Sequence, residues 1–229
     1  MVSEDNFYIT KSRNALPPYG PKQTDIGVLY DFLFGQKTAL FHCGKFSPLN
    51  PEEIACITAI SGFKSANGIT FNSDKTELYV ADMFDKSVSA YSRDPTTGEL
   101  RHLQTLRIWH AVDNLKFDHE SGNIYAGTAN ALYGWFMLFP PTGKPISSNV
   151  GGVAEISKIL IDGERREWAL RNLVVTNKLN GISGGLKMGN QILIGSVSYD
   201  GYLVCPFDNS IKPEFAKFKP KSKKYKNLT

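Results

Sequence analysis

Asn67-Gly-Ile-Thr-Phe…Glu77-Leu-Tyr-Val-Ala and Asn114-Leu-Lys-Phe…Asn123-Ile-Tyr-Ala-Gly are two copies of one pattern. In each copy a side-chain oxygen precedes a short apolar strand, and a polar turn then leads into a second apolar strand. A third copy, Gly185-Leu-Lys-Met-Gly-Asn-Gln-Ile-Leu-Ile-Gly, has its turn shortened to Gly189-Asn190. A repeat of roughly 40–50 residues made of short strands is typical of a β-propeller, with one four-stranded blade per repeat. We therefore predict an all-β propeller.

The other strands can be placed around these copies. The clearest blade runs from Asn67 to Ile108, and the next covers residues 112 to about 163. Partial blades precede and follow them, with strands expected at 7–10, 27–33, 38–43, 54–60, 185–188, 191–197 and 201–207. The β-branched residues of 54–60 favour a strand over a helix. We predict one domain over residues 1–207, with about four blades, an incomplete ring and no helix of normal length.

Composition is ordinary for a globular domain of 229 residues, with 41% hydrophobic and 21% charged residues. No apolar stretch is long enough to span a bilayer, and no motif indicates nucleic-acid binding. The net charge of +4 is concentrated in residues 208–229, which contain seven lysines. Such a tail is typically disordered, and it could contact an acidic surface.

The cysteines and the first residues bear on the compartment. Cys43, Cys56 and Cys205 show no metal-like spacing and cannot all pair with one another, so we expect small buried apolar side chains. The sequence that begins Met1-Val-Ser-Glu-Asp-Asn lacks the features of a signal peptide. Taken literally this favours the cytosol, but we leave the localisation open.

Asn67, Asp113 and Asn114 are the strongest candidates for chemistry. Asn67 and Asn114 begin equivalent strands of successive blades, and Asp113 lies beside the second. Equivalent positions of propeller blades converge on one central channel, so we expect the three side chains to meet at its mouth. One carboxylate with two carboxamides suits Ca²⁺ better than zinc. The alternative is that these residues only cap turns.

Two weaker signals are His110 and the stretch Gly181-Ile-Ser183-Gly-Gly185. His110 lies near the expected channel and is a candidate catalytic base. The second stretch matches the nucleophile elbow of serine hydrolases, which requires a strand before it and a helix after it. A hairpin follows here instead, so we do not expect Ser183 to be a nucleophile.

The two motifs Ser65-Ala-Asn-Gly-Ile-Thr-Phe…Val-Ala-Asp82 and Val112-Asp-Asn-Leu-Lys-Phe…Tyr-Ala-Gly127 resemble the paraoxonase/arylesterase family, and Gly195–Pro206 resembles its last blade. The resemblance extends from about Phe7 to Phe207. It implies a six-bladed propeller with two calcium ions that hydrolyses lactones, aryl esters and some phosphotriesters. It also implies that Asn67, Asp113 and Asn114 bind the catalytic calcium.

The chain departs from that family in several places. The family's first two blades, with further calcium ligands and a histidine pair proposed as the base, have no counterpart in this sequence. The cysteine that would pair with Cys205 is also missing, and Ile9-Thr-Lys replaces an Asp-His pair expected after Phe7-Tyr.

Our leading hypothesis is a calcium-dependent hydrolase of small aryl esters or lactones. Related alternatives are the strictosidine synthase-like and gluconolactonase-like propellers. A propeller remnant acting as a binding scaffold is the alternative from a different class. We expect residues 1–229 alone to hydrolyse esters poorly, and a version extended by two N-terminal blades to be active.

Overall fold

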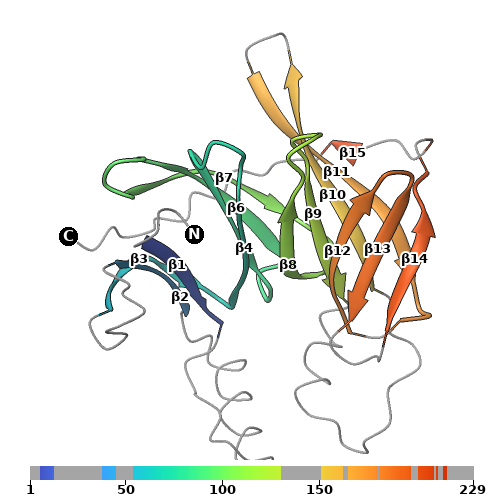
Figure 1. Ribbon diagram of the computed structural model, residues 1–229, viewed down its shortest axis with the longest axis horizontal. Helices are drawn as coiled ribbons and strands as arrows, with labels where there is room; N and C mark the ends of the chain where they lie inside the picture. The colour runs from blue at the N-terminus through green and yellow to red at the C-terminus, as the bar shows by residue number, and fades with distance from the viewer. Residues whose placement is uncertain are drawn as a thin grey trace, which may run out of the picture.

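The computed structural model describes residues 6–12, 38–44, 54–129, 151–161, 165–179, 181–196, 201–208, 210 and 214–215. These residues form four antiparallel sheets and contain no helix. The sheets stand one after another in chain order, as the blades of a propeller do (Figure 1). The prediction of an all-β propeller with about four blades is confirmed.

The first two sheets follow the chain strand by strand. The first contains β1 (Asn6–Lys11), β2 (Thr38–Gly44) and β3 (Ala55–Phe63). The second contains β4 (Ala66–Phe71), β5 (Glu77–Asp82), β6 (Ser87–Arg93) and β7 (Leu100–Arg107). The segment that could have been a helix is thus the strand β3. The strand expected at 27–33 lies outside the described residues.

The third and fourth sheets complete the described fold. The third contains β8 (Ala111–Phe117), β9 (Ile124–Ala129), β10 (Gly151–Ile161), β11 (Arg165–Thr176) and β15 (Glu214–Phe215). The fourth contains β12 (Ile182–Met188), β13 (Gln191–Ser196) and β14 (Tyr202–Pro206). Strand β11 was not predicted, because we ended this blade near residue 163.

Three apolar cores lie between neighbouring sheets. One joins the first and second sheets through Phe63, Val80 and Tyr91. The others join the second to the third sheet, around Tyr79 and Trp168, and the third to the fourth. Because each inner blade is covered on both faces, the middle strands are buried along almost their whole length, and β5 is buried from Leu78 to Asp82. These cores fix how the inner strands of successive blades lie against one another.

A disulfide joins Cys43 on β2 to Cys56 on β3, where the two residues are direct cross-strand partners. Our expectation of three unpaired, buried cysteines was therefore wrong for this pair. Spacing alone did not reveal the partnership, which depends on the register of the hairpin. Cys205 is free and half-buried. Disulfides are typical of oxidising compartments, which argues against the literal cytosolic interpretation.

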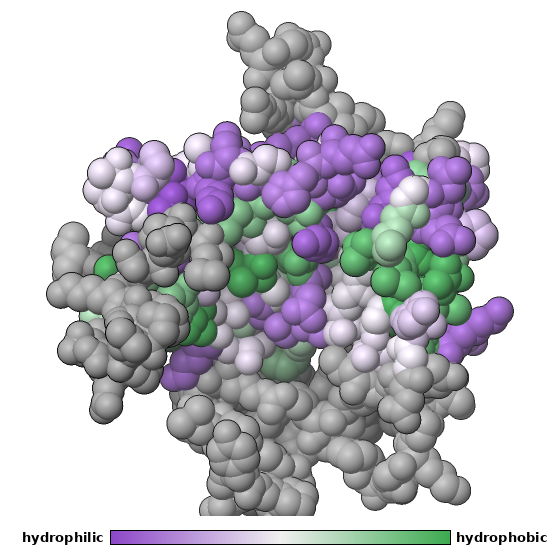
Figure 2. All heavy atoms as spheres, in the orientation of Figure 1, coloured by the Kyte–Doolittle hydropathy of each residue, from purple (hydrophilic) through white to green (hydrophobic). Residues whose placement is uncertain are grey.

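The last sheet presents apolar surface on one face. Figure 2 shows hydrophobic side chains gathered over β13 and β14, and Tyr202 and Val204 of β14 are exposed. Among the described strands, no hydrogen-bonded ladder joins the first sheet to the last. No helix in the described part of the chain is long and apolar enough to cross a membrane.

Candidate functional site

The site is built on β-bulges in the innermost strands of three blades. In β4, Asn67 and Gly68 face the single residue Ala81 of β5. In β8, Asp113 and Asn114 face Gly127 of β9 in the same way. A bulge inserts one extra residue and turns its side chains out of the regular alternation, which is why bulges often occur beside functional sites.

Strand β12 carries the third bulge. Ile182 pairs with Ser196 and Gly184 with Gly195, so that Ser183 is the inserted residue. The three bulges occupy equivalent places in their blades. The register makes Asn67 equivalent to Asp113, and not to Asn114 as the alignment of the two asparagines indicated.

Glycines let these bulges touch. A Cβ atom on Gly68 would lie 2.3 Å from the carbonyl oxygen of Asp113 and 2.7 Å from the Cα atom of Asn114. A Cβ atom on Gly127 would lie 2.4 Å from the carbonyl oxygen of Ser183. Both distances are too short for any side chain, so glycine is required for close approach at these two positions. The backbone of β4 therefore packs directly against the backbone of β8. The backbone of β9, the neighbour of β8, packs in the same way against the start of β12.

Asn67 and Asp113 are in direct contact across the boundary between two blades. The Asn67 amide donates a hydrogen bond to the Asp113 carboxylate. Burial raises the pKa of Asp113 to about 6 from its ordinary 3.8, and the hydrogen bond from Asn67 opposes part of this rise. A carboxylate that is partly withdrawn from water and held by a neutral amide favours a cation close by.

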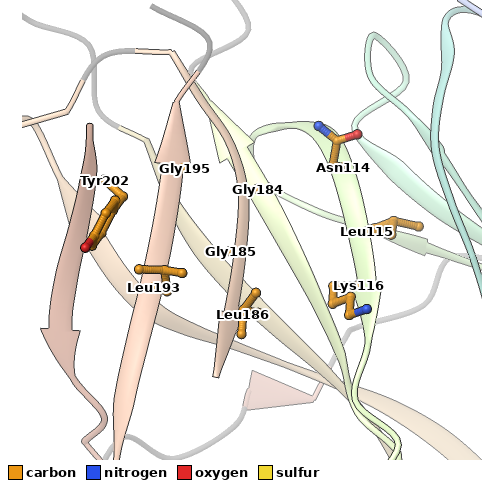
Figure 3. Close-up of a pocket in the computed structure, with 9 residues that line it drawn as sticks. All are labelled: Asn114, Leu115, Lys116, Gly184, Gly185, Leu186, Leu193, Gly195 and Tyr202. Carbon is orange, nitrogen blue, oxygen red and sulfur yellow. The ribbon is translucent and has the colours of Figure 1, made fainter. Parts of the chain in front are cut away.

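Asn114 lies next along the same bulge and is exposed. It stands at the end of a cavity of about 330 Å³, which also contacts Gly184, Leu186 and Leu193. Figure 3 shows β8, with Asn114 and Lys116, beside the part of β12 that contains Gly184 and Gly185, and all four residues line the cavity. The cavity therefore begins at the bulges and extends over the last sheet.

Polar groups around β4 hold the first bulge in place. Asp82 is 3% exposed, and its carboxylate accepts hydrogen bonds from the backbone N–H groups of Lys64 and Ser65, each at 2.9 Å. The Thr10 hydroxyl of β1 donates to the carbonyl oxygen of Asn67 at 2.7 Å. Sequence analysis missed Thr10, because it lies in a blade without a recognisable copy of the repeat.

His110 lies in the bend before β8, three residues from Asp113. Burial, with a contribution from the positive charge of Lys86, lowers the pKa of His110. The imidazole is therefore neutral at pH 7, as a proton acceptor must be. No hydrogen bond joins His110 to Asn67, Asp113 or Asn114 in the described structure.

The donor set is one carboxylate and two carboxamides. The described residues contain no group of three or more His, Cys, Asp or Glu side chains placed to hold a metal. The side-chain oxygens of Asn67, Asp113 and Asn114 suit a hard cation such as Ca²⁺. The negative charge of the Asp113 carboxylate, which is held by a neutral amide, would attract such an ion.

The sequence model of the family described as Arylesterase matches residues 38–164 of the 229. The chain belongs to the arylesterase family. All three candidate metal ligands fall within the matched segment. The match covers the strands from β2 to β10, whereas β1, β11, β15 and the fourth sheet lie outside it.

Individual family members are similar over a shorter stretch. Rat serum paraoxonase/arylesterase 2 is 37% identical over 78 residues, which are 34% of this chain and 21% of the rat protein. Rabbit serum paraoxonase/lactonase 3 is 40% identical over 82 residues, again 34% of this chain and 21% of the relative. The matched region thus spans about a fifth of either relative.

The fold is also similar to that of a solved structure. A candidate 6-phosphogluconolactonase from Bacteroides uniformis superimposes with a TM-score of 0.50 at 13% identity. The similarity covers 77% of this chain and 47% of that one. At this identity the likeness concerns the fold alone.

Proposed function

We propose that this protein is a calcium-dependent hydrolase of aryl esters or lactones. One observation carries the proposal, namely the partly buried Asp113 carboxylate that contacts Asn67 where two bulges meet. Family membership supports the reaction class, and the names of the rat and rabbit relatives include arylesterase and lactonase. The chemistry of the donor set supports calcium.

Asp113, Asn67 and Asn114 would hold the ion. Asp113 supplies the negative charge, and each asparagine supplies a carbonyl oxygen when its amide is turned toward the cation. Bound calcium would polarise the ester carbonyl and stabilise the oxyanion that forms on it. His110, neutral at pH 7, is our candidate for the group that takes a proton from the attacking water.

Calcium titration of the purified chain by calorimetry tests the proposal. We expect one site with a dissociation constant on the order of 10⁻⁴–10⁻³ M, because three protein side chains leave several positions to water or backbone. Hydrolysis of phenyl acetate and δ-valerolactone should be measured in parallel, with and without a chelator. Hydrolysis clearly faster than the uncatalysed rate that persists unchanged in the chelator would rule out a calcium-dependent reaction.

A binding scaffold is the second candidate function. It is favoured by the absence of any hydrogen bond between His110 and the three proposed ligands in the described structure. A scaffold would bind calcium and small esters without hydrolysing them. Strictosidine synthase-like and gluconolactonase-like propellers remain alternatives within the same architecture, and a panel of their substrates in the same assay distinguishes them.

A further inference from the structure

Ser183 occupies the place in the fourth sheet that Asn67 and Asp113 occupy in the second and third sheets. Ser183 and Gly184 face Gly195 across β12 and β13, just as Asp113 and Asn114 face Gly127. The two residues that form the proposed cation site thus have a third structural equivalent. Its side chain is a hydroxyl.

Two contacts place this third bulge beside the site. A Cβ atom on Gly127 would meet the Ser183 backbone at 2.4 Å, so Ser183 lies directly against β9, the neighbour of β8. A Cβ atom on Gly184 would lie 3.8 Å from the Cβ atom of Asn114. The serine therefore adjoins the bulge that carries both Asp113 and Asn114.

The Ser183 hydroxyl differs from other hydroxyls around the inner strands. Thr10, Ser65 and Thr128 each donate to a backbone carbonyl oxygen. Within the described structure no hydrogen bond to Ser183 Oγ is present, although the side chain is half-buried. A half-buried hydroxyl in this position is available to a ligand.

We propose that Ser183 is a substrate-binding residue, whose hydroxyl donates a hydrogen bond to an oxygen of the ester or lactone. This rests on the proposed function. The apolar part of the same substrate would lie in the cavity that starts at Gly184 and runs along Leu186 and Leu193. Ser183 makes no covalent bond, because β12 continues into the hairpin with β13 and not into the helix of a nucleophile elbow.

The first test is binding of a lactam by the full chain in saturating calcium. δ-Valerolactam has the carbonyl group of a lactone but resists hydrolysis, so its affinity does not depend on catalytic activity. We expect Ser183→Ala to weaken binding about 5- to 10-fold, the loss of one neutral hydrogen bond. Ser183→Thr keeps the hydroxyl and should bind as the wild type does. Ser73→Ala, an exposed turn serine at the other end of β4, is the matched control.

The second test addresses the position of Ser183 without any substrate. Ser183→Asp places a second carboxylate at the residue equivalent to Asp113, and it should tighten calcium binding about tenfold or more, because calcium affinity rises with the number of charged ligands. Ser73→Asp adds the same charge far from the bulges and should leave the affinity near that of the wild type.

The outcomes separate this inference from the proposed function. If the wild type binds calcium but not the lactam, or if Ser183→Ala binds the lactam as well as the wild type, Ser183 is not a binding residue and the calcium proposal stands. Equal calcium affinity of Ser183→Asp and wild type would show that the third bulge lies away from the site. If only Ser183→Asp binds calcium, the position is confirmed and the proposed calcium dependence of the natural chain is wrong.

Discussion

At the scale of single residues, the candidate site residues could be named from the sequence, but the register that relates them could not. Their role in binding calcium stays a prediction. Asn67, Asp113 and Asn114 were all identifiable, because oxygen donors at repeated positions of a propeller point to a channel. The equivalence of Asn67 with Asp113 was missed, because a bulge adds a residue that alternation cannot detect. Ser183 was considered only as a nucleophile and was set aside because a hairpin follows it.

Asp113 should matter more for calcium than either asparagine, because it carries the only formal charge of the three. We expect Asp113→Asn to weaken calcium binding about tenfold or more and Asn67→Ala to weaken it less. Calorimetry on both variants measures the difference. Asp94→Asn, in a distant turn where the carboxylate caps Thr96 and Thr97, is the control. Equal calcium affinity of wild type and Asp113→Asn would show that this carboxylate only shapes a turn.

The same substitution should stabilise the calcium-free protein. The pKa of Asp113 is raised to about 6 in the fold, so the charged form costs free energy that the unfolded chain does not pay. This cost is absent below about pH 4, grows as the pH rises toward 6 and stays constant above. Asp113→Asn removes it, so the free energy of unfolding at pH 7 should increase by about 1 kcal/mol after allowance for solvent screening.

Urea unfolding in the presence of a chelator measures this effect. The two proteins should be equally stable at pH 3.5, where both side chains are neutral. A variant that is less stable than the wild type at pH 7 would contradict the assignment of a strained, partly buried charge. Opposite effects on calcium affinity and on stability are the signature of a functional group, since a purely structural carboxylate would lose stability on substitution.

At the scale of elements, most strands followed from alternation and turn residues, and β11 did not. Its residues include Arg171, a charged side chain between the apolar stretches 168–170 and 173–175. The structure shows why this is tolerated, because Arg171 Nη2 lies 2.7 Å from Glu155 Oε1 on the partner strand β10. A bulge in the β10–β11 ladder at Val153 and Ala154 also interrupts the pattern. The sequence of either strand by itself does not reveal that charged residues pair across the two strands.

Gly127 and Gly195 lie opposite equivalent bulges but have different neighbours. Gly127 faces the backbone of Ser183 and Gly184, whereas no described atom lies within 4 Å of a Cβ atom on Gly195. We expect Gly127→Ala to lower the free energy of unfolding by about 1–3 kcal/mol, because the third and fourth sheets must separate. Gly195→Ala is the matched control and should be within about 0.5 kcal/mol of the wild type. Chemical unfolding measures the free energy of unfolding of both variants. Equal losses of stability in the two variants would argue against close contact between the bulges.

The Cys43–Cys56 disulfide closes a short loop, with a sequence separation of 13 residues. A loop of this size contributes about 2–3 kcal/mol to stability in the chain-entropy model. We expect Cys56→Ser to lower the free energy of unfolding by that amount. A thiol reductant should destabilise the wild type to the same level and leave the variant unchanged. A wild type insensitive to reductant would mean that the two cysteines are not bonded.

At the scale of the whole molecule, the innermost strands of the second, third and fourth sheets lie side by side. The site is contributed by β4, β8 and β12, which lie next to one another in Figure 1. Preorganised charge accelerates a reaction most where bulk water is excluded. The Asn114 side chain is instead exposed, so the proposed ion would be open to solvent on that side.

We therefore expect residues 1–229 to hydrolyse phenyl acetate or simple lactones barely above the uncatalysed rate. An extension by further N-terminal blades should give calcium-dependent activity, because it would add ligands and cover the ion. Initial rates of both forms, each with and without a chelator, make the comparison. Robust chelator-sensitive hydrolysis by residues 1–229 alone would show that the described side chains suffice.

The hydrogen bond between Asn67 and Asp113 joins the second and third sheets, which also share an apolar core and the ion pair between Lys158 and Glu77. Apolar packing resists separation of two surfaces but resists sliding weakly, because one contact can replace another. A directional bond at the rim opposes sliding. A calcium ion coordinated by residues of both sheets would oppose this sliding more strongly, because it would link the two blades. Under mechanical load the second and third sheets should then yield at a higher force with calcium than without it.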